Sequence, residues 1–540
     1  MFADTPFLCG KRRKAMLYDW QRECLELIKD KNAIVSAPTN AGKTKVAYIW
    51  MDVKSATEGK HKIIYTVPIK ALANEKCDEL VRIYGKDYVG IETGDIKKRE
   101  NSPILVCTQE IYTRKYVKTK EPMRVIMDEF HYIFSAKDRA RAYVDGIRYA
   151  PKNHQILIMS ATLGNAKRVQ EYLLRATGKE FILYETYFRP TKLEFTQKTF
   201  SLENLPPYSL VYMFHTRTID NVCKYMTSIR PPLPILKRRK IKLLADQYGI
   251  NLERFPEVLH GIAKYHSRLT YTEKRWVERL IKEGYISVVF ATNALGVGVN
   301  LPFEYVVFGH LAVPNGDGYL MLSKTDFLQL SGRAGRKGYF QVGYVSLLEH
   351  GYSVYETKKE REEFYKELLQ KPIEEPSVVL TPNLENIVKG ISTIDEEIDY
   401  IRRFSLPELQ ESKLEEIYSQ LKEVEEKLKN LSELELKALR RFYMPELTFG
   451  ENLKLAELLS KRKPKVYQKQ RLILINPKDL RFIRDSDEIR ELLKKRKVLL
   501  TMHDKTFNRA RIHCEGIEEL TKEIKAKDPL LMQVGEGGEL

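Results

Sequence analysis

Short apolar runs rich in isoleucine and valine alternate with helical patterns through the first third of the chain, and this feature limits the possible folds most strongly. The runs do not alternate apolar with polar residues, so we predict strands buried on both faces of a parallel sheet. Those runs are residues 33–37, 62–67, 104–107, 124–127 and 155–159. Helical patterns between them include residues 44–53 and 69–83. This order predicts an α/β domain with right-handed crossovers.

The same pattern restarts after residue 200. Apolar runs predict a second set of strands at residues 209–214, 287–291, 305–308 and 342–347, and residues 188–200 are predicted to link the two sets. Two α/β domains in tandem create a cleft, and ligands bind at the carboxyl ends of the strands in such clefts. We therefore predict one domain over residues 1–190 and a second domain over residues 191–352.

Residues 353–540 differ in composition and are predicted to form a mostly helical accessory region. Apolar side chains recur there at steps of three and four residues, at Leu414, Ile417, Leu421, Val424, Leu428 and Leu431. Such a stripe predicts a long amphipathic helix over residues 406–431, and packing inside a helical bundle is favoured over a dimeric coiled coil. Basic runs at residues 461–465 and 494–497 are either solvated faces or contacts for a polyanion.

The overall charge is strongly basic, with 91 Lys and Arg residues against 73 Asp and Glu residues and a formal net charge of +18. Such a surface attracts a polyanion, although a basic protein of a thermophile has a similar composition. The six cysteines include no C-x-x-C pair, which is typical of a reducing cytoplasm. The most apolar stretch, residues 286–313, is interrupted by polar residues and proline. We therefore predict a cytoplasmic protein without a membrane partner.

Residues 37–44 match the phosphate-loop pattern G-x-x-x-x-G-K-[ST], with alanine in place of the first glycine. The segment follows a predicted strand and precedes a predicted helix, which is the context that this loop requires. Backbone N–H groups would cradle phosphates there, Lys43 would neutralise the β and γ charges, and the Thr44 hydroxyl would bind Mg²⁺. The predicted nucleotide-binding residues are Ala37, Pro38, Thr39, Asn40, Ala41, Gly42, Lys43 and Thr44.

An acidic pair, Asp128 and Glu129, ends the predicted strand 124–127. Asp128 is predicted to hold Mg²⁺ through water, and Glu129 is predicted to orient the attacking water. His131 follows two residues later, either as a group that couples the nucleotide to nucleic acid or as an ordinary hydrogen-bonding residue of a domain interface. Together with the phosphate loop, this pair predicts an ATP-hydrolysing site.

Two arginines, Arg333 and Arg336, lie three residues apart in the second predicted domain, and this spacing would place them on one helical face. Phosphoryl transfer needs cations for the charge that develops on the phosphate, and an arginine often supplies one. An arginine carried by the second domain would make hydrolysis depend on closure of the cleft. That dependence is the physical basis of a motor.

These motifs resemble the superfamily 2 helicases of the superkiller branch, which includes exosome-associated RNA helicases and archaeal DNA-repair helicases. The resemblance covers roughly residues 17–350, in the family's order. The matching segments are residues 17–21, 37–44, 67–76, 93–95, 107–110, 128–131, 160–165, 290–302 and 329–336. It implies two tandem RecA-like domains of parallel sheet, a DEAD/DEAH-type acidic box, and ATP and Mg²⁺ as cofactors.

The resemblance also implies roles for single residues. Gln21 would read adenine, Gly298 and Asn300 would support the interdomain cleft at the nucleotide, and Gln329 would act with the two arginines in catalysis. Ser160 and Thr162 would join His131 in coupling. Contacts to phosphates and sugars, which position a strand without reading its bases, would come from Pro68, Lys70, Gly94, Asp95, Thr108 and Thr292. Taken alone, residues 93–95 are equally well an ordinary surface turn.

In this branch a β-hairpin between the last two motifs separates strands, and residues 310–326 occupy that interval here. Residues 315–318 are a good turn sequence, so Tyr319, Leu320 and Met321 form either a strand-separating pin or part of an ordinary connection. The chain is too short for the larger accessory domains of the branch. Residues 378–404 are interpreted as a reduced winged helix and residues 406–431 as a ratchet-like helix. The isolated pair His503 and Asp504 is interpreted as incidental rather than as a nuclease site.

The sequence therefore predicts an ATP-dependent helicase that translocates 3′ to 5′ and unwinds DNA or RNA. Two alternatives remain: an ATP-gated clamp that remodels nucleic acid without processive unwinding, and the helicase subunit of a CRISPR interference complex. The predicted partner is single-stranded or partly duplex nucleic acid, with proteins of a repair, RNA-decay or defence complex as further partners of a monomeric chain. Backbone contacts do not show whether a 2′-hydroxyl is required, so DNA and RNA stay open.

Overall fold

The computed structural model divides into two compact units. Met1–Ile91, Arg99–Tyr132 and Asp145–Pro376 form the first unit, and Glu92–Lys98, Ile133–Val144 and Ser377–Leu540 form the second. The residues described are 17–94, 96–135, 137–292, 301–315, 318–336, 338–351, 353, 356–443, 448–460, 466–469, 472–475, 499–503 and 509–513. Among these residues, no helix is both long and apolar enough to cross a membrane.

The first sheet has eight strands in the order β4-β3-β5-β2-β6-β7-β1-β8. The strands are β1 (Ala33–Ser36), β2 (Lys62–Val67), β3 (Val89–Glu92), β4 (Lys97–Lys98), β5 (Ile104–Thr108), β6 (Met123–Met127), β7 (His154–Ser160) and β8 (Ile182–Glu185). All five predicted strands are present to within a residue or two at each end, and every residue of β1 and β5 is buried, as expected for strands covered on both faces.

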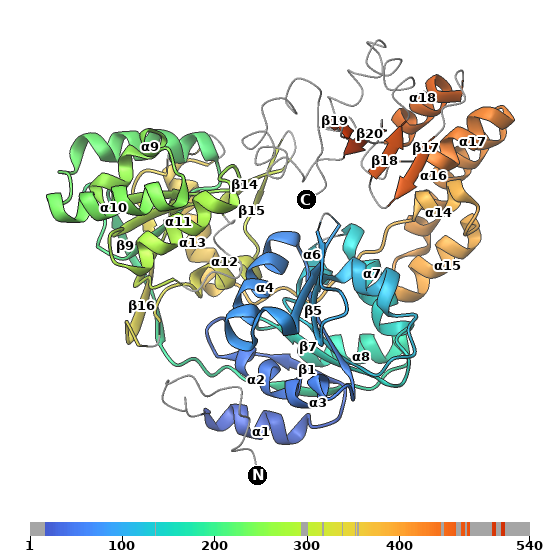
Figure 1. The fold of residues 1–540 in the computed structure, drawn as a ribbon, viewed down its shortest axis with the longest axis horizontal. Coiled ribbons are helices and arrows are strands. Elements are labelled where there is room, and N and C mark those ends of the chain that lie inside the picture. Colours follow the sequence, from blue (N-terminus) through green and yellow to red (C-terminus); the bar gives the residue numbers. More distant parts are fainter. Residues whose placement is uncertain are drawn as a thin grey trace. The chain divides into compact units, whose positions relative to one another are not determined.

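Helices connect and cover these strands (Figure 1). They are α1 (Asp19–Leu27), α2 (Lys43–Trp50), α3 (Val53–Thr57), α4 (Lys70–Tyr84), η2 (Lys86–Tyr88), α5 (Gln109–Ile111), η3 (Tyr112–Tyr116), α6 (Tyr132–Ser135), α7 (Lys137–Arg148) and α8 (Ala166–Thr177). The single helix predicted over residues 44–53 is wrong, because the chain breaks at Asp52, whose φ is 46° and whose side chain caps α3 through the Ser55 N–H. A left-handed residue ends an α-helix.

The second sheet has six parallel strands in the order β11-β12-β10-β13-β16-β9. Its elements are β9 (Lys192–Phe200), β10 (Ser209–Tyr212), α9 (Thr216–Ile229), α10 (Ile235–Tyr248), η4 (Leu252–Arg254), η5 (Pro256–His260), β11 (Ile262–Tyr265), α11 (Tyr271–Lys282), β12 (Val288–Ala291), β13 (Tyr305–Phe308), α12 (Lys324–Ser331), β16 (Val342–Leu348) and α13 (Lys358–Gln370). Along β10, Leu210 and Tyr212 join one core cluster and Val211 joins another, so both faces are buried.

One prediction about this sheet is wrong. Residues 188–200 do not act only as a linker, because residues 192–200 form the edge strand β9 and pair with β16. Four of the nine residues of β9 are exposed and none is buried, so the run lacks the continuous apolar pattern of a buried strand. Between β13 and α12, strands β14 (Ala312–Asn315) and β15 (Gly318–Met321) form an antiparallel hairpin, as predicted.

The accessory unit is a group of helices with a small antiparallel sheet. Its helices are α14 (Leu384–Lys389), α15 (Ile394–Phe404), α16 (Glu411–Lys429), α17 (Glu433–Phe442) and α18 (Phe449–Ser460), and the strands β17 (Val466–Lys469), β18 (Leu472–Ile475), β19 (Leu499–His503) and β20 (Arg509–His513) pair in the order β17-β18-β20-β19. The sheet was not expected from the sequence. The basic runs at residues 461–465 and 494–497, and Asp504, lie outside the described residues.

The apolar stripe of the long helix packs inside this bundle, as predicted. Leu421 of α16 is buried in one cluster with Ile387 of α14 and with Ile394 and Ile398 of α15, and Ile417 packs against the same cluster. The helix begins at Glu411 rather than at residue 406. Since the cluster covers Ile417 and Leu421 from within the chain, the stripe needs no second copy to explain it.

Candidate nucleotide site and nucleic-acid interface

The phosphate loop connects the buried strand β1 to helix α2, in the context that the sequence predicted. Asn40 and Gly42 adopt left-handed backbone conformations, with φ of 67° and 101°, and Gly42 is the N-cap of α2. Ala37 has no positive φ, so a side chain at this position causes no backbone strain. The substitution of alanine for the first glycine of the pattern is therefore compatible with the loop. Ala37 and Ala41 are buried, and the half-buried members are Pro38, Thr39, Asn40, Gly42, Lys43 and Thr44.

The Lys43 amine lies within the loop. Its Nζ donates to the carbonyl oxygens of Ala37 at 2.5 Å and Pro38 at 3.0 Å. Burial lowers the pKa of Lys43, and the nearby carboxylates of Glu129 and Asp128 act in the opposite direction. A cation held among two carbonyls and two acidic side chains is placed to meet the β and γ phosphates of a nucleotide.

The acidic box follows strand β6. Asp128 Oδ1 accepts from the Glu129 N–H at 2.9 Å, and Oδ2 accepts from the Tyr65 hydroxyl at 2.7 Å. Burial raises the pKa of Asp128, and the neighbouring Glu129 raises it further. Each carboxylate oxygen has a second lone pair besides the one in its hydrogen bond, so Asp128 can also accept from a water bound to Mg²⁺. Asp128 therefore fits the metal that the sequence predicts, and Thr44, in the first turn of α2, is the second predicted ligand.

Tyr65 is a site residue that sequence reasoning missed. It is fully buried on β2, the strand beside β6, and burial raises its pKa well above its usual value of 10, so its hydroxyl stays a donor to Asp128. The Lys76 amine lies 5.2 Å from the Tyr65 ring centroid and donates to the Tyr48 hydroxyl at 3.2 Å and to Glu79 at 2.8 Å. A tyrosine in an apolar strand gives no signal in the sequence that its hydroxyl reaches an acidic residue after another strand.

The coupling candidates lie close to the acidic box. His131 Nδ1 lies 3.4 Å from Glu129 Oε2, but the His131 ring is buried without a hydrogen-bond partner among the described atoms. Burial lowers the pKa of His131, so the ring is neutral near pH 7. The Ser160 hydroxyl at the end of β7 is also buried without a partner in the described part of the chain, and Thr162 follows it. The coupling roles stay predictions.

One prediction about residues 332–336, which we call the arginine segment, is wrong. Arg333 and Arg336 do not share a helical face, because α12 ends at Ser331. The chain turns away at Gly335, whose φ is 71° and whose N–H donates to the Phe303 carbonyl at 2.9 Å. The Gly335 backbone passes so close to Gly343 that a Cβ there would lie 2.8 Å from the Gly343 nitrogen. Gly335 thus provides a turn that spacing alone did not reveal. Gln329 lies on α12 before this turn.

The arginine segment contacts the phosphate loop directly. The Asn40 side-chain amide donates to the Gly332 carbonyl at 2.8 Å, and a Cβ on Gly332 would lie 2.8 Å from the Thr39 Cβ. The positive charge of Arg333 contributes to the lowered pKa of Lys43, after the larger effect of burial. The first sheet's loop and the second sheet's arginine are therefore parts of one site.

Arg189, which precedes β9, is a second residue that sequence reasoning missed. Its guanidinium donates to the carbonyl of Gly332 at 3.2 Å and to the carbonyl of Ala334. Its Nε donates to the Thr191 carbonyl at 3.0 Å, and burial lowers the pKa of Arg189 to about 10. Arg189 thereby supports the backbone that carries Arg333.

Gln21 lies on α1 beside the phosphate loop. Its side-chain amide donates to the Gly42 carbonyl at 3.0 Å, and its Oε1 accepts from the Tyr18 N–H at 2.9 Å. The Tyr18 ring packs against Phe188 with centroids 4.7 Å apart. Gln21 is buried and both ends of its carboxamide are engaged, so the contact with adenine stays a prediction.

The candidate nucleic-acid contacts that the structure describes follow the carboxyl ends of strands. Pro68 follows β2 and Lys70 begins α4, and Thr108 ends β5, where it is paired in register with Val67. Thr292 follows β12 of the second sheet. In the accessory unit, Gly94 lies in a turn that the Thr93 N–H closes on the Ile96 carbonyl at 2.8 Å, whereas Asp95, Gly298 and Asn300 lie outside the described residues.

Comparisons with known proteins agree with the motifs. Residues 18–169 match the DEAD/DEAH box helicase family and residues 236–338 match the helicase conserved C-terminal domain. The chain is 28% identical over 412 residues to the DExH-box ATP-dependent RNA helicase DExH9 of Arabidopsis thaliana, covering 62% of this chain and 41% of that protein. It is 24% identical over 410 residues to the probable helicase HelY of Mycobacterium tuberculosis, covering 61% and 45%.

These curated relatives are longer proteins, and the chain spans less than half of their length. The crystal structure of the DUF1998 helicase MrfA bound to DNA aligns with a TM-score of 0.51 at 18% identity, covering 71% of this chain and 55% of that one. At this identity the likeness concerns the fold alone. Together with the two family matches, it confirms the predicted pair of RecA-like domains followed by a helical region.

Replacing Tyr65 with phenylalanine is expected to weaken the metal site without changing the shape of the core. Asp128 would lose one hydrogen bond, at a cost of about 1 kcal/mol or roughly fivefold. We expect the Mg²⁺ concentration for half-maximal ATPase activity, and that for half-maximal binding of a fluorescent ATP analogue, to rise by about that factor. Tyr84→Phe is the matched control, since Tyr84 contacts Tyr48 rather than Asp128. Equal Mg²⁺ dependence in Tyr65→Phe and the wild type would contradict the role given to this hydroxyl.

Replacing Gly332 with alanine is expected to separate the arginine segment from the phosphate loop. The φ of Gly332 is −59°, so the change is steric, with the new Cβ 2.8 Å from the Thr39 Cβ. We expect ATP turnover to fall by about tenfold or more, since small misplacements of catalytic groups have effects of that order. Gly450→Ala, where a Cβ meets nothing within 4 Å, should leave turnover unchanged. Wild-type turnover in Gly332→Ala would show that this close contact is dispensable.

Proposed function

The chain contains a DEAD/DEAH box helicase domain and a helicase conserved C-terminal domain, and on that premise we propose that it is an ATP-driven motor that moves along nucleic acid and separates strands. The observation that carries this proposal is the direct contact between the phosphate loop and the arginine segment, through Asn40 and Gly332. Since the two segments come from different sheets, the arrangement of nucleotide ligands depends on how the sheets are held together. Such a dependence converts hydrolysis into movement.

The chemistry of the site follows from the geometry of its residues. Mg²⁺, when bound through Asp128 and Thr44, would neutralise phosphate charge. Lys43 adds positive charge from inside the loop, and Arg333 adds it from the second sheet. Glu129, whose N–H is fixed on Asp128, would orient the attacking water. Hydrolysis would remove the γ-phosphate that Lys43 and Arg333 are proposed to contact, and so would weaken the attraction between the two sheets.

The proposed track is single-stranded or partly duplex nucleic acid, gripped by its backbone near Pro68, Lys70, Thr108 and Thr292. The relatives include a protein named as an RNA helicase and the fold is shared with a helicase solved with DNA, so both nucleic acids enter the test. The β14–β15 hairpin favours unwinding over a passive clamp, because Tyr319 and Leu320 are 49% and 60% exposed and can stack on a duplex end. Translocation is proposed to run 3′ to 5′, as in the family that the motifs resemble.

Strand displacement tests this function. Duplexes of DNA and of RNA with either a 3′ or a 5′ overhang would be incubated with ATP at a stated salt concentration, because basic proteins bind polyanions in a salt-dependent way. We expect ATP-dependent displacement from 3′ overhangs and nucleic-acid-stimulated ATPase activity, both abolished in Lys43→Ala. Lys60→Ala, a change at an exposed ion pair, controls for the lost charge. Binding without displacement on every substrate would favour the clamp, and normal turnover in Lys43→Ala would contradict the assignment of the site.

A further inference from the structure

The accessory unit contains a segment that is far from it in the sequence. Residues Ile133–Val144 belong to this unit together with Ser377–Leu540, although they lie between β6 and β7 of the first sheet. The segment begins two residues after His131, the last member of the acidic box. It includes most of helix α7 (Lys137–Arg148). Contacts that fix this segment in the accessory unit therefore constrain the chain directly after the acidic box.

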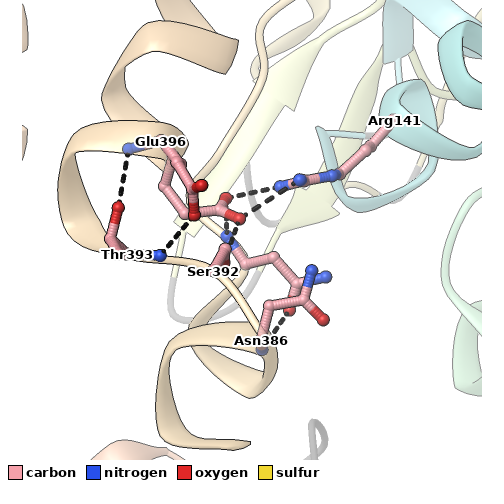
Figure 2. Close-up of polar contacts among 7 residues, drawn as sticks. Arg141, Asn386, Ser392, Thr393 and Glu396 are labelled. Carbon is pink, nitrogen blue, oxygen red and sulfur yellow. Dashed lines mark hydrogen bonds and ion pairs between the residues drawn. The ribbon is translucent and has the colours of Figure 1, made fainter. Parts of the chain in front are cut away.

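An ion pair ties the segment to the accessory helices of the same unit. Arg141 of α7 forms two parallel hydrogen bonds to the Glu397 carboxylate of α15, with Nη1–Oε2 at 2.5 Å and Nη2–Oε1 at 3.1 Å. The guanidinium also lies over the Tyr400 ring, 4.0 Å from its centroid. Figure 2 shows Arg141 reaching from its helix toward the turn that carries Ser392 and Thr393. A planar guanidinium that both stacks and makes two bonds is fixed in one orientation, which lysine cannot reproduce.

The Glu397 carboxylate is buried and fully hydrogen-bonded. Its side chain is only 1% exposed. Beyond the two bonds from Arg141, Oε2 accepts from the Asn383 N–H at 2.9 Å and Oε1 accepts from the Ser392 hydroxyl at 2.7 Å. All four lone-pair directions of the carboxylate are thereby used. Asn383 caps α14, and Ser392 lies in the turn before α15. The pair thus joins α7 to the starts of two accessory helices.

The C-terminal end of α7 lies against Gln109 and Thr113, which follow the candidate nucleic-acid contact Thr108. A Cβ on Gly146 would lie 2.6 Å from Gln109 Nε2 and 2.5 Å from Thr113 Oγ1, so the helix backbone lies directly on these side chains. Gln109 follows Thr108 and accepts from the Thr66 hydroxyl at 2.8 Å. Arg141 and Gly146 are five residues apart on one helix, about 7.5 Å along its axis. The helix that carries Arg141 therefore continues to Gly146 and the side chains that follow β5.

We propose that the Arg141–Glu397 pair is a mechanical coupling: it positions α7 against Gln109, next to the candidate contact Thr108, so that nucleic acid stimulates hydrolysis fully only while the pair is intact. The coupling rests on the proposed function, since it presumes a nucleic-acid track. Arg141 and Glu397 are positioning residues, which touch neither nucleotide nor track. Without the pair, the nucleotide site stays complete but responds less to nucleic acid.

Steady-state ATPase assays with and without saturating nucleic acid test this coupling. Arg141→Ala alone leaves a buried carboxylate without its cation, and such a loss can unfold the surrounding structure. The decisive variant is therefore Arg141→Ala with Glu397→Gln, in which no buried charge remains and the amide oxygen can still accept from Asn383 or Ser392. We expect basal turnover within about twofold of wild type and stimulation reduced by about fivefold or more, in the range typical of coupling between sites.

A matched control and a fold measurement sharpen the test. Arg402 lies on the same helix as Glu397 and forms an exposed ion pair with Glu411 of α16, so Arg402→Ala should leave stimulation at the wild-type value. Limited proteolysis reports whether the accessory unit of the double variant is intact. Full stimulation in a double variant whose accessory unit is intact overturns the coupling. The coupling is also overturned if Arg402→Ala loses as much stimulation as the double variant does. Wild-type protein that nucleic acid does not stimulate contradicts both the coupling and the proposed function, whereas full stimulation in the double variant contradicts the coupling alone.

Discussion

The hydrogen bond from the Asn40 amide to the Gly332 carbonyl joins two segments that belong to different sheets, and the nucleotide site depends on that join. The phosphate loop supplies its lysine and its backbone N–H groups from the first sheet. The arginine segment supplies its cation from the second. Because Gly332 lies against Thr39 with no room for a side chain, the two segments can approach only where a glycine is present. Arg189 then supports the same backbone from the chain between the sheets.

The sequence predicted the parts of the site that depend on local pattern. The phosphate loop, the acidic pair and the hairpin are each formed by residues that are close together in the sequence. The spacing of residues identifies such local motifs. Backbone geometry also explains why the departure at Ala37 is harmless, since the left-handed positions of the loop are Asn40 and Gly42. The motif order carried the family assignment, which the matches at residues 18–169 and 236–338 confirmed.

The parts that sequence did not predict depend on contacts between distant segments. In the sequence, Tyr65 is not distinguished from the apolar residues of its strand. Its hydroxyl donates to Asp128 only because β2 pairs with β6. The spacing of Arg333 and Arg336 is that of one helical face, but the chain leaves the helix before them, and the Gly335 N–H donates a hydrogen bond to the Phe303 carbonyl. Residues 192–200 have too mixed a composition for a buried strand, yet they pair with β16 at an edge. In each case a tertiary contact overrides a local preference.

The Arg141–Glu397 pair extends the same principle to the accessory unit. A carboxylate buried among four donors fixes a helix that begins shortly after the acidic box, so the core and the accessory helices share an element. Within the accessory unit, the pair fixes the first part of α7, and the last residues of the same helix belong to the first unit.

ATP affinity and ATP turnover of an Arg333→Ala variant test most directly whether hydrolysis needs a cation from the second sheet. Because Lys43 and the phosphate loop stay intact, ATP affinity should stay within about threefold of wild type, while turnover should fall by about a thousandfold, the order of effect that such arginines have. Turnover within about tenfold of wild type, with nucleic acid saturating, would contradict this account of the site.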